Sequence, residues 1–341
     1  MSFPDYGYRI TGAEGGRVQA GAAGRVQAGG AGRVRAAEAG RVQAAWAGRV
    51  LVAGATGRFG QITELLLARG HAVRAATRNP DSPAAARLTA LGAEVVRADF
   101  EDRRSLAAAA AGVDAVFASG TAHRAGPAGE ERHGRNLAEA LAAAGAPRLV
   151  FVSGAGADLR TGVAVLDAKG AVERRIAELG LPATVIAPVY LMENLVNPWN
   201  LAALRAGILP TPLPPALRLQ QVATSDVLAL AVLAIEQPDA VKGGGERIEV
   251  ASDAPTGAEA ASALTRLLGR EFTARQLPRA DLPRGLTALF AWLDHDPSRV
   301  DVGALRDRFP DITWHSFGDW ASQQRTLLAE ASGVAPAANA L

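Results

Sequence analysis

The feature that most constrains this chain is RVLVAGATGRFG at residues 49–60, an apolar run leading into three glycines. Val50 to Ala53 are short, apolar and partly β-branched, which is typical of a buried parallel strand, and residues 61–69 are typical of a helix. The spacing G-x-x-G-x-x-G lets the backbone approach a pyrophosphate that faces the helix N-terminus. The loop therefore supplies candidate dinucleotide contacts: Gly54, Thr56, Gly57, Arg58, Phe59 and Gly60.

The residues after the next predicted strand, 73–76, indicate which dinucleotide is bound. An NAD site carries Asp or Glu near the end of this strand, where the acid binds the ribose 2′-hydroxyl. This chain reads VRAATRNP and has no acid there. Thr77 and Arg78 stand where a 2′-phosphate needs a hydroxyl and a planar cation, so we expect NADP(H). The alternative for Arg78 is a solvated loop arginine.

Strands and helices alternate along the next hundred residues. Four more strands are predicted at 94–97, 115–118, 149–152 and 183–187, with helices between them at 103–111, 129–144 and 169–179. This alternation predicts an α/β fold, a doubly wound Rossmann-type parallel sheet with its ligand at the carboxyl ends of the strands. Further candidate cofactor contacts follow these strands: Asp99, Phe100, Ser119, Gly120 and Pro188. For the first two of these residues an alternative role carries equal weight: Asp99 as a helix cap and Phe100 as a core aromatic.

Beyond Pro188 the pattern changes. Residues 190–222 are rich in Pro and Leu and predict a loop-rich wall over the cleft, whereas helices are expected at 226–236, 256–268 and 281–294 and a strand at 247–251. We expect an NADP-binding domain and a smaller, discontinuous substrate lobe. The expected bounds are 48–190 and 220–252 for the domain, 191–219 and 253–330 for the lobe, and 331–341 for a flexible tail.

Residues 1–47 form a tandem repeat in which GRV recurs every eight residues. On a helix this period drifts by about 80° per copy and builds no apolar stripe, so we expect a disordered extension. An arginine-spaced nucleic-acid arm and a transit peptide are weaker alternatives. Residues 1–48 hold six arginines and three acids, and the whole chain carries +2, so the remainder carries −1. The folded part is not basic, and no nucleic-acid partner is expected.

Composition excludes several other classes of protein. No apolar run approaches the roughly 18 residues of a membrane span, so no membrane association is expected. The chain has no cysteine, and its five histidines show no paired metal-ligand spacing. We therefore expect a cytoplasmic protein without a metal.

Six motifs follow one another in a fixed order: GATGRFG, TRNP, ADFED, FVSGAG, AKGAVERRIAELGLPATVIAPVYLMENL and VATSDVLALAVLAI. In this order, over roughly residues 48–325, the chain resembles the NmrA-like branch of the atypical short-chain dehydrogenases/reductases. The resemblance implies NADP(H) and the reduction of a small quinone, azo or carbonyl acceptor, in a monomer or homodimer. It equally allows a non-catalytic redox sensor with a protein partner. One departure is Ala187, where the family often has arginine before the proline.

The resemblance also suggests catalytic candidates. The proton-donating tyrosine of related enzymes lies four residues before a lysine, but here that position is Val165. Lys169 remains, one of only two lysines against 34 arginines, and by resemblance it would hydrogen-bond the nicotinamide ribose or polarise a substrate oxygen. The alternative is a surface pair with Glu173 one turn later. Ser153 matches the position of the substrate-facing serine of related enzymes, and the alternative is that it only closes the turn with Gly154. Tyr190 is a candidate for supplying a phenol to the substrate pocket, and the alternative is an amphipathic residue of the pocket wall.

Overall fold

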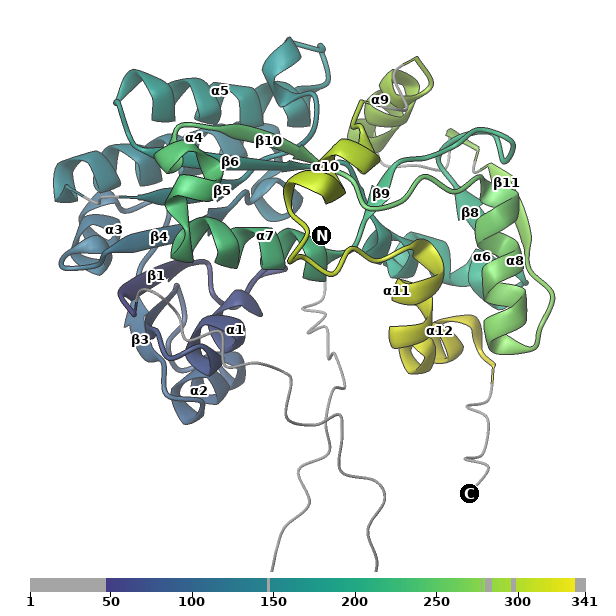
Figure 1. The fold of residues 1–341 in the computed structure, drawn as a ribbon, viewed down its shortest axis with the longest axis horizontal. Helices are drawn as coiled ribbons and strands as arrows, with labels where there is room; N and C mark the ends of the chain where they lie inside the picture. Colours follow the sequence, from purple (N-terminus) through teal and green to yellow (C-terminus); the bar gives the residue numbers. More distant parts are fainter. Residues whose placement is uncertain (1–46, 146–147, 277, 280–283, 296–298, 335–341) are drawn as a thin grey trace, which may run out of the picture.

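The structure is a computed structural model that describes residues 47–145, 148–276, 278–279, 284–295 and 299–334. Its centre is a parallel sheet in the order β10-β6-β5-β4-β1-β2-β3 (Figure 1). The chain runs from β1 outward in both directions, which confirms the doubly wound fold class. The strands are β1 (Arg49–Ala53), β2 (Ala72–Thr77), β3 (Glu94–Arg97), β4 (Ala115–Ser119), β5 (Leu149–Val152), β6 (Ala183–Pro188) and β10 (Arg247–Val250).

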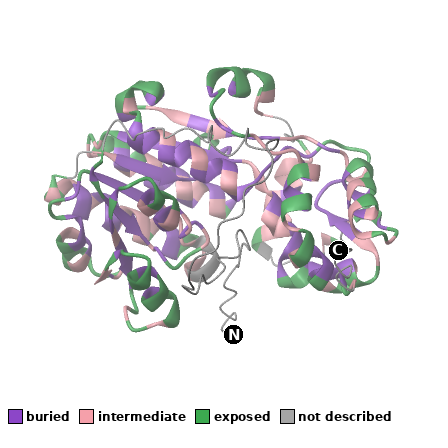
Figure 2. Cartoon of the chain, turned by 60° about the horizontal axis from the view of Figure 1, so that its bottom comes forward, coloured by how far each residue is buried: buried purple, intermediate pink, exposed green. Residues whose placement is uncertain are grey.

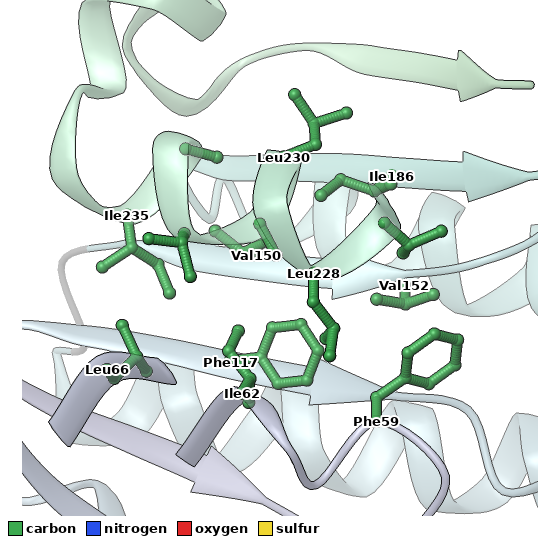
Figure 3. Packing of buried hydrophobic residues seen from close by; sticks show 14 of the residues in the cluster. Phe59, Ile62, Leu66, Phe117, Val150, Val152, Ile186, Leu228, Leu230 and Ile235 are labelled. Carbon is green, nitrogen blue, oxygen red and sulfur yellow. The ribbon is translucent and has the colours of Figure 1, made fainter. Parts of the chain in front are cut away.

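Alternate residues of the inner strands pack into hydrophobic cores on opposite faces of the sheet. In β1, Val50 and Val52 join one core, whereas Leu51 and Ala53 join the other. Figure 3 shows Ile62 and Leu228 packed around Phe117 in the first core. The first face is covered by α1 (Ile62–Ala68), α2 (Pro83–Ala90), α7 (Thr224–Glu236) and α10 (Val302–Arg308). The opposite face is covered by α3 (Arg103–Ala110), α4 (Ala122–Ala144) and α5 (Ala164–Glu178).

A smaller group of elements lies beside the sheet (Figure 2). It has its own core, which contains the almost fully buried Trp320. Capping boxes at Thr256 and Ser316 begin two of its helices. The elements of this group are β8 (Ile208–Thr211), β11 (Thr273–Gln276), α6 (Leu201–Arg205), α8 (Gly257–Leu268), α11 (Phe317–Gln323) and α12 (Arg325–Ser332). The remaining elements are β7 (Tyr190–Leu191), β9 (Gln221–Val222), α9 (Arg284–Leu293), η1 (Ala157–Leu159), η2 (Met192–Val196), η3 (Pro198–Asn200) and η4 (Pro238–Gly244).

Residues 190–222 hold more regular structure than the sequence predicts. The segment contains β7, α6, β8 and β9, each of five residues or fewer. Elements this short show no periodicity and depend on tertiary partners, such as the pairing of β8 with β11. The expected extension falls outside the described residues up to residue 46, as does the expected tail from residue 335.

Candidate active site

The glycine loop joins β1 to α1 and is fixed against β2. The amides of Gly54 and Ala55 donate to the carbonyl of Ala76 at 3.2 and 3.1 Å, and the amide of Gly57 donates to the carbonyl of Gly54 at 2.8 Å. Gly54 has a φ of +79°, which side chains other than glycine rarely adopt. Within the described part of the chain, the amides of Arg58 and Phe59 donate to no other residue. Two donors of the loop are thus free to bind an anion.

A hydroxyl and two arginines meet at the ends of β2 and β3. Thr77 is buried, and its hydroxyl lies 3.5 Å from that of Thr56. Arg78, the next residue, is exposed. Arg97 lies opposite Thr77 in the β2–β3 register and donates from Nη1 to the carbonyl of Arg78 at 3.4 Å. Sequence reasoning missed Arg97, because only the strand register reveals that it neighbours Arg78.

Asp99 and Phe100 lie directly after β3, beside the loop. The cap of α3 is Asp102, which accepts the amide of Arg104 at 2.9 Å, so the helix-cap alternative for Asp99 is wrong. The ring of Phe100 stacks on His133 with centroids 5.8 Å apart. A Cβ placed on Gly54 would lie 3.7 Å from that ring, so Phe100 borders the first glycine of the loop.

Lys169 extends from α5 to the carboxyl ends of β4 and β5. Its ammonium lies 2.7 Å from Oε1 of Glu130, which is buried on α4. A Cβ on Gly120 would lie 2.4 Å from Lys169 Nζ, and one on Gly154 would lie 3.4 Å from its Cδ. The structure thus brings three predicted residues, Lys169, Gly120 and Gly154, to one point. Glu130 was not predicted, and the lysine does not form the alternative pair with Glu173.

Ser153 directly follows β5 and donates its hydroxyl to the carboxylate of Glu173 on α5. Glu173 also pairs with Arg247 of β10, whose Nε lies 3.0 Å from Oε2. Arg247 in turn donates to the carbonyl of Gly154 at 3.0 Å. The Ser153 side chain is therefore part of a charged network that fixes the loop after β5.

Tyr190 lies on β7, where the sheet meets the smaller group of elements. Burial raises the pKa of its phenol well above the ordinary value, and the nearby Arg58 guanidinium opposes only part of this shift. Arg58 donates to Oδ1 of Asn194 at 2.9 Å, so the glycine loop is joined to the segment after β7. The phenol is therefore a protonated donor near the loop. The segment LMENL, directly after Tyr190, contains Glu193. Its carboxylate accepts the backbone amide of Thr224 and the indole N–H of Trp320.

An apolar crevice begins at Tyr190 and runs between β8 and α8. It is narrow, with a cavity volume of about 40 Å³. Its lining includes Met192, Leu209, Leu213 and Phe317. Such a surface suits an apolar molecule rather than a charged one.

Two kinds of feature are absent from the described residues. No helix there is long and apolar enough to cross a membrane. No group of His, Cys, Asp or Glu side chains in the same residues is arranged to hold a metal ion.

Comparison with known proteins connects this geometry to a family. The family model described as the NmrA-like family matches residues 47–291. A Streptomyces griseus protein named (4-alkanoyl-5-oxo-2,5-dihydrofuran-3-yl)methyl phosphate reductase is 30% identical over 286 residues, which cover 81% of this chain and 87% of that protein. The match to an Aspergillus japonicus NmrA-like oxidoreductase, himF, is 34% identical and spans only 52% of its length.

Solved structures share the fold. The Escherichia coli NADPH-dependent quinone oxidoreductase QOR2, complexed with NADPH, superposes with a TM-score of 0.67 at 24% identity, over 81% of this chain and 99% of the other. NmrA, a negative transcriptional regulator, superposes with a TM-score of 0.68 at 20% identity, over 85% and 99% of the two chains. The match of the family model over most of the described residues shows that this chain belongs to the NmrA-like family.

Proposed function

We propose that this protein is an NADP(H)-dependent oxidoreductase that reduces a small quinone, azo or carbonyl acceptor by hydride transfer. The observation that carries the proposal is the position of Lys169. Its ammonium lies against Gly120 at the end of β4, on the sheet edge that also carries the glycine loop. In a doubly wound sheet this edge is where ligands bind.

The residues of the loop fit the cofactor. The free amides of Arg58 and Phe59 suit the pyrophosphate, and Thr77 with Arg78 and Arg97 suits the 2′-phosphate. Phe100 and Asp99 border the loop where an adenine would lie. Ser119 and Pro188 end their strands on the same edge, Gly120 follows Ser119, and the three residues would line the nicotinamide half. When bound, NADPH supplies the hydride.

The chain's own groups would bind and polarise the acceptor. Lys169 carries three N–H donors, of which the described residues use one on Glu130. Tyr190 keeps its proton and can donate to an acceptor oxygen on which negative charge develops. The apolar crevice beside Tyr190 favours a hydrophobic acceptor. Ser153, whose hydroxyl is held by Glu173, would act mainly by fixing the loop after β5.

The name of the Streptomyces relative supports one type of acceptor in particular. A 5-oxo-2,5-dihydrofuran with a 4-alkanoyl group has a carbon–carbon double bond conjugated to carbonyls. Such an enone, like a quinone, accepts hydride at carbon while charge develops on oxygen. We therefore extend the proposed carbonyl acceptors to conjugated enones.

A second candidate function is a non-catalytic NADP(H) sensor with a protein partner. Val165 occupies the position of the usual proton-donating tyrosine, which leaves cofactor binding intact. The structural likeness to the regulator NmrA is compatible with this alternative.

Oxidation of NADPH, followed by absorbance against a panel of a naphthoquinone, an azo dye and a conjugated enone, separates the two candidates. We expect turnover with at least one acceptor and a fall in kcat of about tenfold or more in Lys169→Met, as is typical when a positioned donor is lost. Lys242→Met is the matched control, since Lys242 is the other lysine and its side chain is 73% exposed. Tight NADPH binding without turnover of any acceptor in the panel would refute the proposed oxidoreductase activity and favour the non-catalytic sensor.

A further inference from the structure

We propose that Glu130 is a positioning residue that holds the ammonium of Lys169 at the end of β4. This inference rests on the hydride-transfer site proposed above. The Glu130 side chain is 1% exposed and that of Lys169 is 16% exposed, with 2.7 Å between Oε1 and Nζ. Buried carboxylates and ammonium groups are stable only when they are paired, so neither group is free to rotate away.

The second carboxylate oxygen fixes Glu130 from the sheet side. Oε2 accepts the backbone amide of Thr121, one residue after Gly120. Glu130 also lies in the first turn after the break of α4 at Gly126, whose φ is +68°. The carboxylate is therefore held both by its helix and by the loop that follows β4.

Gly120 provides the space that the ion pair occupies. A Cβ on this residue would lie 2.0 Å from Glu130 Oε1 and 2.4 Å from Lys169 Nζ. Both distances are far below van der Waals contact, so no larger residue fits without displacing the pair. The pair thus lies directly against Gly120, which follows β4, where the nicotinamide half of a cofactor would approach.

The competing carboxylate cannot replace Glu130. Glu173 lies one helical turn after Lys169, the usual position for a surface pair. Its two oxygens are taken by the Ser153 hydroxyl and by Arg247. Lys169 is therefore directed to Glu130 and to the edge of the sheet rather than along α5.

The pair with Glu130 limits what Lys169 can do. An ammonium group has no acceptor and can only donate. The carboxylate occupies one of its N–H groups and fixes where the remaining ones lie. Glu130 would thus act on the reaction through Lys169, without touching the substrate.

Competitive labelling of amines tests this without any need for turnover. The chain has only two lysines, so trace acetic anhydride followed by peptide mass spectrometry reports Lys169 against Lys242 as an internal reference. We expect Lys169 to label more slowly than the exposed Lys242. Glu130→Gln keeps the shape of the side chain but removes the charge that holds the ammonium in place, so it should speed labelling of Lys169 relative to Lys242 by about tenfold. Glu131→Gln is the matched control, because its side chain is exposed and pairs with Arg135.

Kinetics with an acceptor that is turned over separate positioning from folding. Glu130→Gln should lower kcat by about tenfold while the Kd for NADPH stays within about threefold, and Glu130→Asp should recover part of kcat. Gly120→Ala, which displaces the pair, should speed Lys169 labelling in the same way. Equal labelling of Lys169 and Lys242 in the unaltered protein, or no change in Glu130→Gln, would overturn the proposal. A protein without turnover but with the expected labelling would refute only the proposed function.

Discussion

At the scale of single residues, Arg78 is where the choice between NADP and NAD can be tested. A charged hydrogen bond to the 2′-phosphate contributes about 1.5–3 kcal/mol, so Arg78→Ala should raise the Kd for NADPH by about tenfold to a hundredfold. The Kd for NADH, which has no phosphate at that position, should stay unchanged. Titration of intrinsic fluorescence with each nucleotide measures both values.

Arg87→Ala is the control for this measurement. Arg87 is also an exposed arginine, but it lies on α2 and pairs with Glu64. An equal loss of NADPH and NADH affinity in Arg78→Ala would refute its role at the 2′-phosphate. The alternative, a solvated loop arginine, would then hold.

Residues of the site differ in how far the sequence predicts them. The glycine loop is readable because its backbone geometry is local and its spacing is fixed. The role of Glu130 cannot be predicted from the sequence, because Glu130 stands beside Glu131 and both are acids on one helix. Only the fold separates them, with side-chain exposures of 1% and 41%. Arg97 was missed for the same reason, because its partner Arg78 lies at the end of another strand.

At the scale of elements, the sequence predicts the strands of the central sheet best. The bounds expected for β3 and β5 agree with the structure at residues 94–97 and 149–152. The predicted helix at 129–144 begins earlier, at Ala122, because α4 continues across the break at Gly126. Helix α2 was not predicted, since its Ala-rich sequence has a weak pattern and depends on the cap at Ser82 and Pro83.

The packing of α5 against η1 gives a prediction whose sign runs against helix propensity. Gly170 is a helical residue, and replacing such a glycine with alanine ordinarily stabilises by about 1 kcal/mol. Here the new Cβ would lie 2.1 Å from the carbonyl oxygen of Ala157, a backbone atom that must move. Overpacking of this kind costs about 1–3 kcal/mol. We therefore expect Gly170→Ala to lower the free energy of unfolding, measured by urea denaturation.

Gly285→Ala is the matched control for the effect of alanine itself. Gly285 lies in α9, and a Cβ there meets nothing within 4 Å. This substitution should leave stability unchanged or raise it by up to about 1 kcal/mol. If Gly170→Ala instead raised the free energy of unfolding, η1 would be shown to adjust freely, and the close approach of α5 to η1 would not be required.

At the scale of the whole molecule, the alternation of strands and helices was sufficient to predict the sheet, but not what packs against it after residue 300. Leu305, Phe309 and Ile312 join the core on the α1 side of the sheet, whereas Phe317 and Trp320 join the smaller core. The chain therefore crosses between the two cores within a few residues. The sequence has no signal for this crossing, because both sets are apolar residues on short helices. The division into domain and lobe accordingly remains a proposal.

The repeat segment decides the sign of the net charge of the whole chain. All six arginines and three acids of residues 1–48 precede residue 47, so removal of residues 1–46 changes the net charge from +2 to −1. The truncated protein should lose retention on a cation exchanger at pH 7. Its Kd for NADPH should stay within about twofold, because every candidate contact lies beyond residue 53 and free loop amides, not distant charges, supply most of the binding.

Full-length and truncated proteins, compared by fluorescence titration and thermal unfolding at two salt concentrations, provide the measurement. If the repeats act only through their charge, any small difference in NADPH affinity should vanish at high salt. At 1 M salt, electrostatic interactions over more than about 3 Å are largely screened. A tenfold rise in Kd that persists at high salt, or a fall in Tm of more than about 4 °C, would instead show that the repeats pack on the folded chain. The two outcomes differ because screening removes a long-range field and leaves a packed contact in place.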